Sequence, residues 1–201
     1  MNSRTWPAVV GGVLFAAAGA PAWGESGVGS VAFVGQLAVS MLGGGLLLLA
    51  VIVIARSVRV GALGRWGFGL VVAGLIAHLV GTVLGAVGAG LASVAHSVVG
   101  VVSGPVWMLA HLGYIGTTLV GIAAWRAGSV PRPVAVALIT CAPVVLVGVP
   151  AGLALASAAG TVVSDSVAWV ATELQFGLVW LLVGVVRSRP TVGSPAEVPV
   201  G

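Results

Sequence analysis

The arginines of this chain are grouped in a way that fixes where its apolar segments can lie. All eight basic residues are arginines, and they fall at four places: Arg4; Arg56, Arg59 and Arg65; Arg126 and Arg132; Arg187 and Arg189. Long apolar stretches with few or no charges separate these places. Arginine resists translocation and is attracted to anionic headgroups, so membrane proteins retain it on the cytoplasmic side. The sequence therefore predicts a membrane protein whose arginine-bearing loops are cytoplasmic.

Composition excludes an ordinary soluble domain. Only 6% of the residues are charged and the mean hydropathy is +1.21, whereas soluble proteins carry about 25% charged residues. The net charge of +4 is divided among separate loops with no basic run, so we expect no nucleic-acid partner. The expected surroundings are the lipid bilayer, with a further subunit or a second copy as a possible partner.

We expect one all-α domain over residues 1–189, an integral membrane bundle of six transmembrane helices. A span needs at least about 17 mainly apolar residues. The expected spans are residues 7–23, 31–55, 67–90, 105–125, 133–158 and 167–186. The uncharged run from Trp66 to Trp125 is too long for one span, and we expect it to break between Ser93 and Pro105, with His96 in an outer loop. Both termini are then cytoplasmic, and residues 190–201 form a disordered cytoplasmic tail.

Residues 1–22 allow a second interpretation. Arg4, an apolar stretch and the small residues around Ala20 also fit a cleavable signal peptide. Proline directly after a cleavage point is unfavourable, and only one charge precedes the apolar stretch, which favours an uncleaved first helix. Cleavage would leave five spans and move only the N-terminus to the other side.

Glycines and prolines predict where helices pack and bend. In lipid, small residues allow the close backbone contact that holds helices together. One face of the third span carries a polar and glycine-rich set: Gly74, His78, Gly81, Thr82, Gly85 and Gly88. We expect this face, and the Gly81-x-x-x-Gly85 pair in particular, to pack closely against protein. Pro143 and Pro150 predict a kink in the fifth span.

Three ionisable residues fall inside the expected spans: His78, His111 and Glu173. Ionisable groups are costly in a membrane, so such residues are functional candidates. With a rise of ~1.5 Å per residue, all three lie at a similar depth in the outer half of the bilayer. Aromatic residues lie on the same helix faces as His111 and Glu173. We therefore expect an outer-half ligand or proton site formed by His78, His111, Glu173, Tyr114, Trp107, Trp169 and Trp180.

Several functions are compatible with this cluster. We expect a non-enzymatic membrane protein that binds or moves a small molecule or a proton. A structural or interaction subunit of a membrane complex is an alternative, because interhelical hydrogen bonds also stabilise bundles. A haem-carrying redox protein, with haem or metal at His78 and His111, is another, although no HxxxH or ExxH spacing supports it. No nucleophile elbow or phosphate loop is present, so we expect no catalytic residues, no metal and no resident cofactor.

The turn between the fourth and fifth spans has a recognisable pattern. Trp125-Arg126-Ala127-Gly128 ends one helix, and Ser129-Val130-Pro131-Arg132 opens the next. This hairpin resembles the loop of several families of small, multi-span prokaryotic membrane proteins of unknown function. The resemblance implies a helical bundle in the plasma membrane of a bacterium or archaeon, and it carries no catalytic residues.

Overall fold

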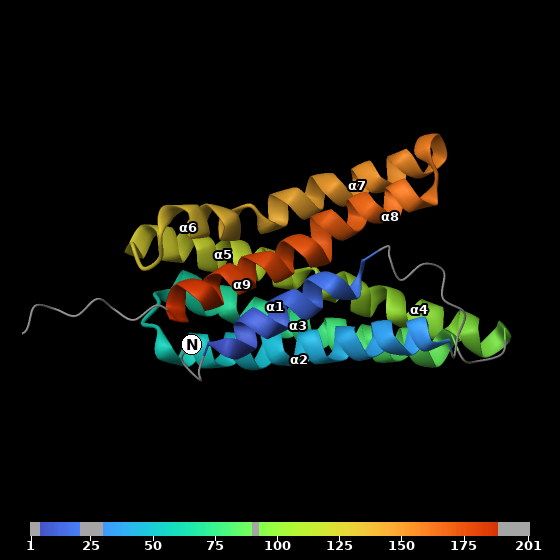
Figure 1. The fold of residues 1–201 in the computed structure, drawn as a ribbon, viewed down its shortest axis with the longest axis horizontal. Coiled ribbons are helices and arrows are strands. Elements are labelled where there is room, and N and C mark those ends of the chain that lie inside the picture. Colours follow the sequence, from blue (N-terminus) through green and yellow to red (C-terminus); the bar gives the residue numbers. More distant parts are fainter. Residues whose placement is uncertain (1–4, 21–29, 90–92, 189–201) are drawn as a thin grey trace, which may run out of the picture.

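The computed structural model describes residues 5–20, 30–89 and 93–188, and this part of the chain is all-helical (Figure 1). Its residues are 91% helical with no strand. The elements are α1 (Trp6–Ala18), α2 (Val31–Ser57), α3 (Ala62–Ala89), α4 (Ser93–Ala110), α5 (Leu112–Ala127), α6 (Arg132–Ile139), α7 (Cys141–Ala159), α8 (Thr161–Trp169), the π-helical segment η2 (Val170–Leu174) and α9 (Gln175–Ser188). The predicted all-α fold is confirmed, and the expected tail at residues 190–201 lies outside the described residues.

Helix length and apolarity support four or five membrane crossings among the described residues. Four stretches suffice on their own: Val31–Ser57, Ala62–Gly88, Val101–Ala127 and Val162–Ser188. The bent pair Arg132–Ile139 and Cys141–Ala156 provides a fifth if it forms one span. The first expected span is shorter than predicted, because α1 ends at Ala18 and its 13 residues cover about 20 Å of a hydrocarbon core ~30 Å thick.

The uncharged run from Trp66 to Trp125 breaks just before the predicted stretch and not within it, because α3 ends at Ala89 and α4 begins at Ser93. α4 begins at Ser93 and continues through Pro105 to Ala110, and α5 follows directly after His111. A helix satisfies its own backbone hydrogen bonds, which favours helix even at serine and glycine when water is absent. His96 therefore belongs to α4, and the connection from α3 to α4 lies outside the described residues.

The kink expected from the prolines lies between α6 and α7, which are bent by 43° at Thr140. Pro143 has no N–H to donate to the carbonyl of Ile139 four residues earlier. The Thr118 hydroxyl of α5 takes the place of this missing donor. This hydroxyl donates to the Ile139 carbonyl at 3.1 Å and accepts the Ala142 N–H at 3.0 Å. A side chain of a neighbouring helix thus stabilises the bend.

The two ends of the elongated bundle differ (Figure 1). At one end α2 passes into α3, α5 passes into α6, and α9 finishes. The described arginines belong to this end: Arg56, Arg59, Arg65, Arg126, Arg132 and Arg187. At the other end the α7–α8 hairpin diverges from α2, α3 and α4, and the last turn of α1 lies near the fork.

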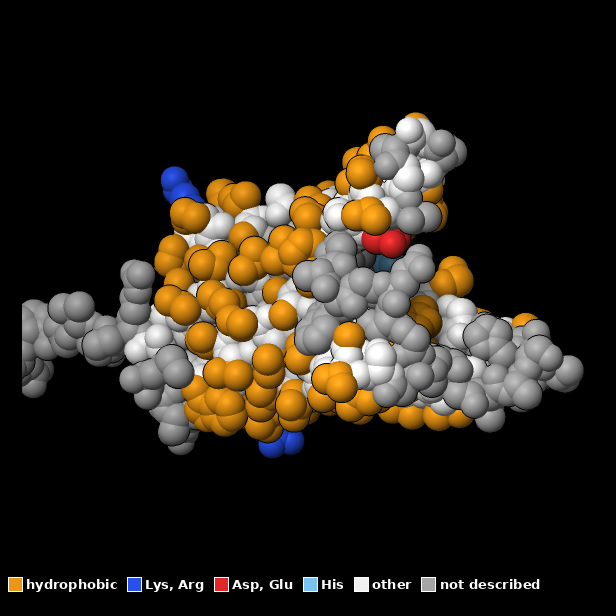
Figure 2. Space-filling model, turned by 45° about the vertical axis from the view of Figure 1, so that its right-hand side comes forward, with side chains coloured by type: hydrophobic (Ala, Val, Ile, Leu, Met, Phe, Trp, Pro, Cys, Tyr) orange, Lys and Arg blue, Asp and Glu red, His pale blue; other side chains and the backbone are white. Residues whose placement is uncertain are grey.

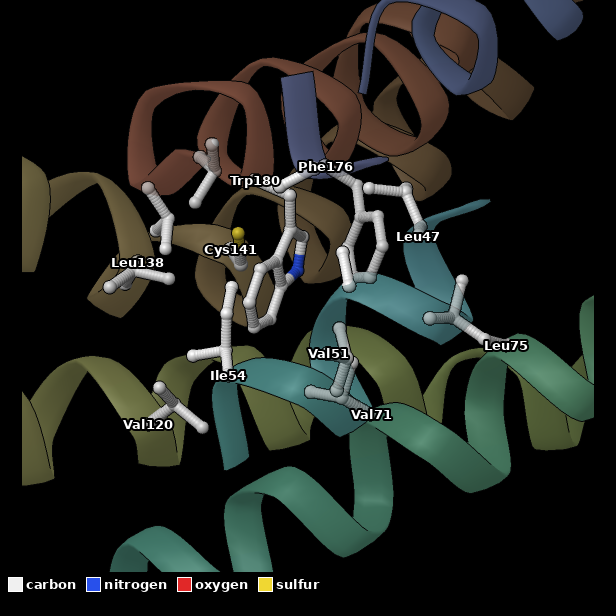
Figure 3. Close-up of a cluster of buried hydrophobic side chains, with 14 of the residues drawn as sticks. Leu47, Val51, Ile54, Val71, Leu75, Val120, Leu138, Cys141, Phe176 and Trp180 are labelled. Carbon is white, nitrogen blue, oxygen red and sulfur yellow. The ribbon is translucent and has the colours of Figure 1, made fainter. Parts of the chain in front are cut away.

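The core is apolar and lies in the middle of the bundle. Trp180 is fully buried among residues of several helices, including Ile54, Phe176 and Cys141 (Figure 3). Its indole N–H donates to the Thr117 hydroxyl at 3.2 Å. Large apolar side chains also cover much of the outer surface visible in Figure 2. An apolar exterior around an apolar core is the pattern of a helical membrane protein.

Candidate functional site

Three polar side chains link α2 and α3 near the fork. The Ser40 hydroxyl lies 3.1 Å from Nε2 of His78 and 3.4 Å from the Thr82 hydroxyl. Thr82, one turn after His78, donates to the His78 carbonyl at 2.9 Å. The side chains of Ser40 and His78 are buried, so these contacts replace hydrogen bonds to water.

The contacts define one consistent arrangement of protons. Thr82 uses its single proton on the His78 carbonyl, so it accepts a hydrogen bond from Ser40. Ser40 then accepts from Nε2–H of His78. In this neutral tautomer Nδ1 of His78 is an acceptor, and within the described part of the chain it makes no hydrogen bond. Among the described residues, His78 therefore retains one proton-accepting nitrogen that makes no hydrogen bond.

Aromatic rings hold the imidazole of His78 in place. Its centroid lies 4.7 Å from that of Phe15 on α1 and 5.2 Å from that of Trp107 on α4, and the latter pair is edge-to-face. Trp107 lies over Gly81, where a Cβ would come within 3.0 Å of the indole. The ring is thus fixed between three helices.

Glu173 faces the same region from η2. Its carboxylate accepts a hydrogen bond from the neighbouring Thr172 hydroxyl. A Cβ at Gly19 would lie 3.0 Å from the carboxyl group, so the end of α1 passes directly beside it. π-helical turns are frequent at functional sites because they displace side chains from the regular helical pattern.

Side chains of neighbouring helices cap the end of α1. The Trp169 indole N–H donates to the Ala16 carbonyl at 2.7 Å, and the Gln36 amide donates to the Ala18 carbonyl at 3.1 Å. These carbonyls belong to the last helical turn, where intrahelical donors are missing. These two contacts place the α1 terminus between α2 and the end of α8.

A cavity of about 220 Å³ lies between these groups. Its polar lining residues are Gln36, Ser40, His78, Thr82 and Glu173, and its aromatic ones are Phe33 and Trp107. Figure 2 shows an acidic side chain, with histidine atoms beside it, in a notch at the foot of the α7–α8 hairpin. The structure therefore brings a carboxyl group and an imidazole to one cavity at the end opposite the arginines.

The predicted site residues divide into two groups. His78, Glu173 and Trp107 line the cavity, whereas Tyr114, Trp169, His111 and Trp180 do not. Trp169 supports the cavity through its hydrogen bond to the end of α1, and the Tyr114 ring packs against those of Phe176 and His111. Trp180 lies in the core near Thr117 and does not line the cavity. It follows Phe176 by one helical turn and so lies nearer to the arginine end.

His111 lies beside the cavity. It is exposed, and its Nδ1–H donates to the Trp107 carbonyl at 3.0 Å. It interacts electrostatically with Glu173, yet among the described residues no hydrogen bond or ion pair joins Glu173 to His111 or His78. Contact between the carboxyl group and a histidine, direct or through water, stays a prediction.

The residues present do not favour a metal or haem site. Within the described ranges no three His, Cys, Asp or Glu side chains are close enough to share a metal ion. Nε2 of His78 is engaged by Ser40, and its ring is packed between Phe15 and Trp107. A haem placed between His78 and His111 would have to displace these aromatic contacts.

Sequence reasoning missed Ser40, Gln36 and Phe33 as lining residues. Ser40 and Gln36 are the only hydrogen-bonding side chains between Val31 and Ala55, and they fall one turn apart, so their spacing was an available signal. Phe15 gave no such signal, because it is one apolar residue among many in α1.

Comparisons with protein-family models, with curated proteins and with solved structures found no match to this chain.

Proposed function

We propose that this is a polytopic, non-enzymatic membrane protein that binds a small molecule in the cavity between His78 and Glu173. The observation that carries the proposal is the cavity itself, with a carboxyl group, an imidazole and three other polar side chains. Small-molecule sites combine an apolar wall with a few convergent polar groups. Within the described residues Nδ1 of His78 has no hydrogen bond, so it is available to a ligand in the cavity.

The proposed orientation places the arginine end in the cytoplasm and the cavity in the outer half of the membrane. All described arginines lie at one end of the bundle, and the described acids, Asp165 and Glu173, belong to α8 and η2. By the positive-inside rule, this asymmetry supports the proposed orientation. With α1 as a sixth, short crossing, both termini are cytoplasmic. A prokaryotic plasma membrane is part of this proposal.

A proton exchange at the site is the second part of the proposal. Glu173 and His78 are the two groups lining the cavity that can gain or lose a proton. A ligand that hydrogen-bonds more strongly to one protonation state of either group binds with an affinity that depends on pH.

Replacing Glu173 by glutamine tests the proposal, because the change keeps the shape and removes the titrating carboxyl group. We expect Glu173→Gln to lose at least about 90% of the small molecule that copurifies with the wild-type protein, measured by solvent extraction and mass spectrometry, because the lost hydrogen bond to a charged group costs about 1.5–3 kcal/mol. Asp165→Asn, an exposed acid outside the cavity, is the matched control and should retain it.

The structural-subunit alternative makes a different prediction for the same pair of variants. If the polar cluster only stabilises the bundle, Glu173→Gln lowers the midpoint of thermal unfolding in detergent, and both proteins carry the same extracted compounds. Equal extracts from the wild type and Glu173→Gln would contradict a binding function.

A further inference from the structure

A second cavity, of about 170 Å³, lies at the arginine end. Its apolar wall includes Phe68 of α3, Val120 of α5, Leu138 of α6 and Trp180 of α9. Arg59, Ser129 and Arg187 are its polar lining residues. Arg59 and Ser129 lie in the exposed connections between α2 and α3 and between α5 and α6, so the polar side of the cavity is at the end of the bundle.

Arg187 is held in place at this cavity. Its Nη2 donates to the Ser57 hydroxyl at 3.0 Å, and Ser57 in turn donates to the Ile54 carbonyl at 2.9 Å. Neither Arg187 nor Arg59 forms an ion pair with an acidic side chain in the described part of the chain, where the acids belong to α8 and η2. Two guanidinium groups without an acidic partner thus border an apolar cavity.

We propose that this cavity binds an anionic phospholipid, with the phosphate on Arg59 and Arg187 and part of one acyl chain among Phe68, Leu138 and Trp180. Guanidinium groups bind phosphate in a bidentate manner. A cavity of about 150 Å³ accommodates a group as large as benzene, so this one admits a short stretch of acyl chain. The cytoplasmic leaflet is the one that carries anionic lipid. Only the choice of leaflet rests on the orientation proposed above.

Native mass spectrometry of the full-length protein in detergent tests this site independently of orientation. The protein is titrated with phosphatidylglycerol or with phosphatidylcholine of the same chains. We expect one phosphatidylglycerol to bind at least about tenfold more tightly than phosphatidylcholine. Arg59→Gln and Arg187→Gln should each weaken phosphatidylglycerol binding about fivefold, since one basic residue contributes ~1 kcal/mol to anionic-lipid attraction. Arg132→Gln, an exposed arginine at the same end but outside the cavity, should change binding less than twofold.

Two further measurements separate a lipid from other occupants. Ala124→Leu narrows the cavity without changing charge and should weaken binding, whereas millimolar inorganic phosphate should not compete. Full competition by phosphate would mean a free-anion site and would overturn the lipid assignment. Equal binding of the two lipids, or equal effects of Arg59→Gln and Arg132→Gln, would overturn the site. The compounds extracted from Glu173→Gln concern only the first cavity, so that experiment can fail without affecting the lipid site.

Discussion

Single hydroxyl groups complete the hydrogen bonding at the irregular points of this bundle. Thr118 bridges the bend between α6 and α7, and the Thr172 hydroxyl of η2 lies 2.6 Å from the Ala168 carbonyl. In an apolar surrounding an unpaired backbone group costs several kcal/mol. One threonine at the right position therefore permits a bend or a π turn that the helix alone would not tolerate.

Replacing Thr118 by valine should destabilise the protein by about 1–2 kcal/mol. The substitution keeps the shape but leaves the Ile139 carbonyl and the Ala142 N–H without their partner. Ser166→Ala is the control, because its hydroxyl only bonds back to Val162 within the same helix. Chemical denaturation in mixed micelles measures both. If both variants have the same free energy of unfolding as the wild type, Thr118 does not stabilise the bend.

At the scale of helices, glycines determine how closely neighbouring elements approach. α3 and α5 meet at Gly74, where an added Cβ would lie 2.6 Å from Gly113 Cα and 2.8 Å from the Ala110 carbonyl. By contrast, a Cβ at Gly85 would meet no atom of the described residues within 4 Å, because Gly85 lines the first cavity. The expectation that Gly85 packs as closely as Gly81 is therefore wrong.

Gly74→Ala and Gly85→Ala form a matched pair on one helix. We expect Gly74→Ala to lower the free energy of unfolding by at least about 2 kcal/mol, because backbone must move to admit the methyl group. Gly85→Ala should be neutral or stabilise by about 0.5–1 kcal/mol through higher helix propensity. Thermal unfolding in detergent compares them. A larger loss at Gly85 than at Gly74 would contradict the packing described.

The apolar runs of the sequence predicted the long helices well and their local detail poorly. The bounds of α2 agree with expectation to within two residues and those of α3 to within five, because one uninterrupted apolar run has only helix as a solution in lipid. The π segment at Glu173 was not predictable, because no periodicity in the sequence marks it, and Glu173 packs there beside Gly19 at the end of α1. His78 and Glu173, which depth along the helices predicted to share a site, both line the first cavity. Depth could not show that Trp180 lies in the core instead.

At the scale of the whole molecule, the packing of α1 bears on whether this segment is a retained helix or a cleaved signal peptide. It packs on α9 so closely that a Cβ at Gly177 would lie 2.7 Å from the Ala16 nitrogen. Ala8 and Phe15 of α1 are buried in the common core, and Phe15 contacts both His78 and Phe176. Removing α1 would open the core and one wall of the first cavity, which supports its retention.

Retention of α1 leads to a topology that reporter fusions can test. Reporters placed after Arg59, after Gly128 and at Gly201 should be cytoplasmic, and those near Glu25, His96 and Asp165 external, because the arginines lie at one end of the bundle. A tag before Met1 should remain on the full-length protein and be cytoplasmic. Loss of this tag with all other reporters unchanged would indicate cleavage, leaving the core without α1. An external reporter after Gly128 would contradict the orientation itself, since Arg126 and Arg132 flank that connection, and with it the placement of the lipid site in the cytoplasmic leaflet.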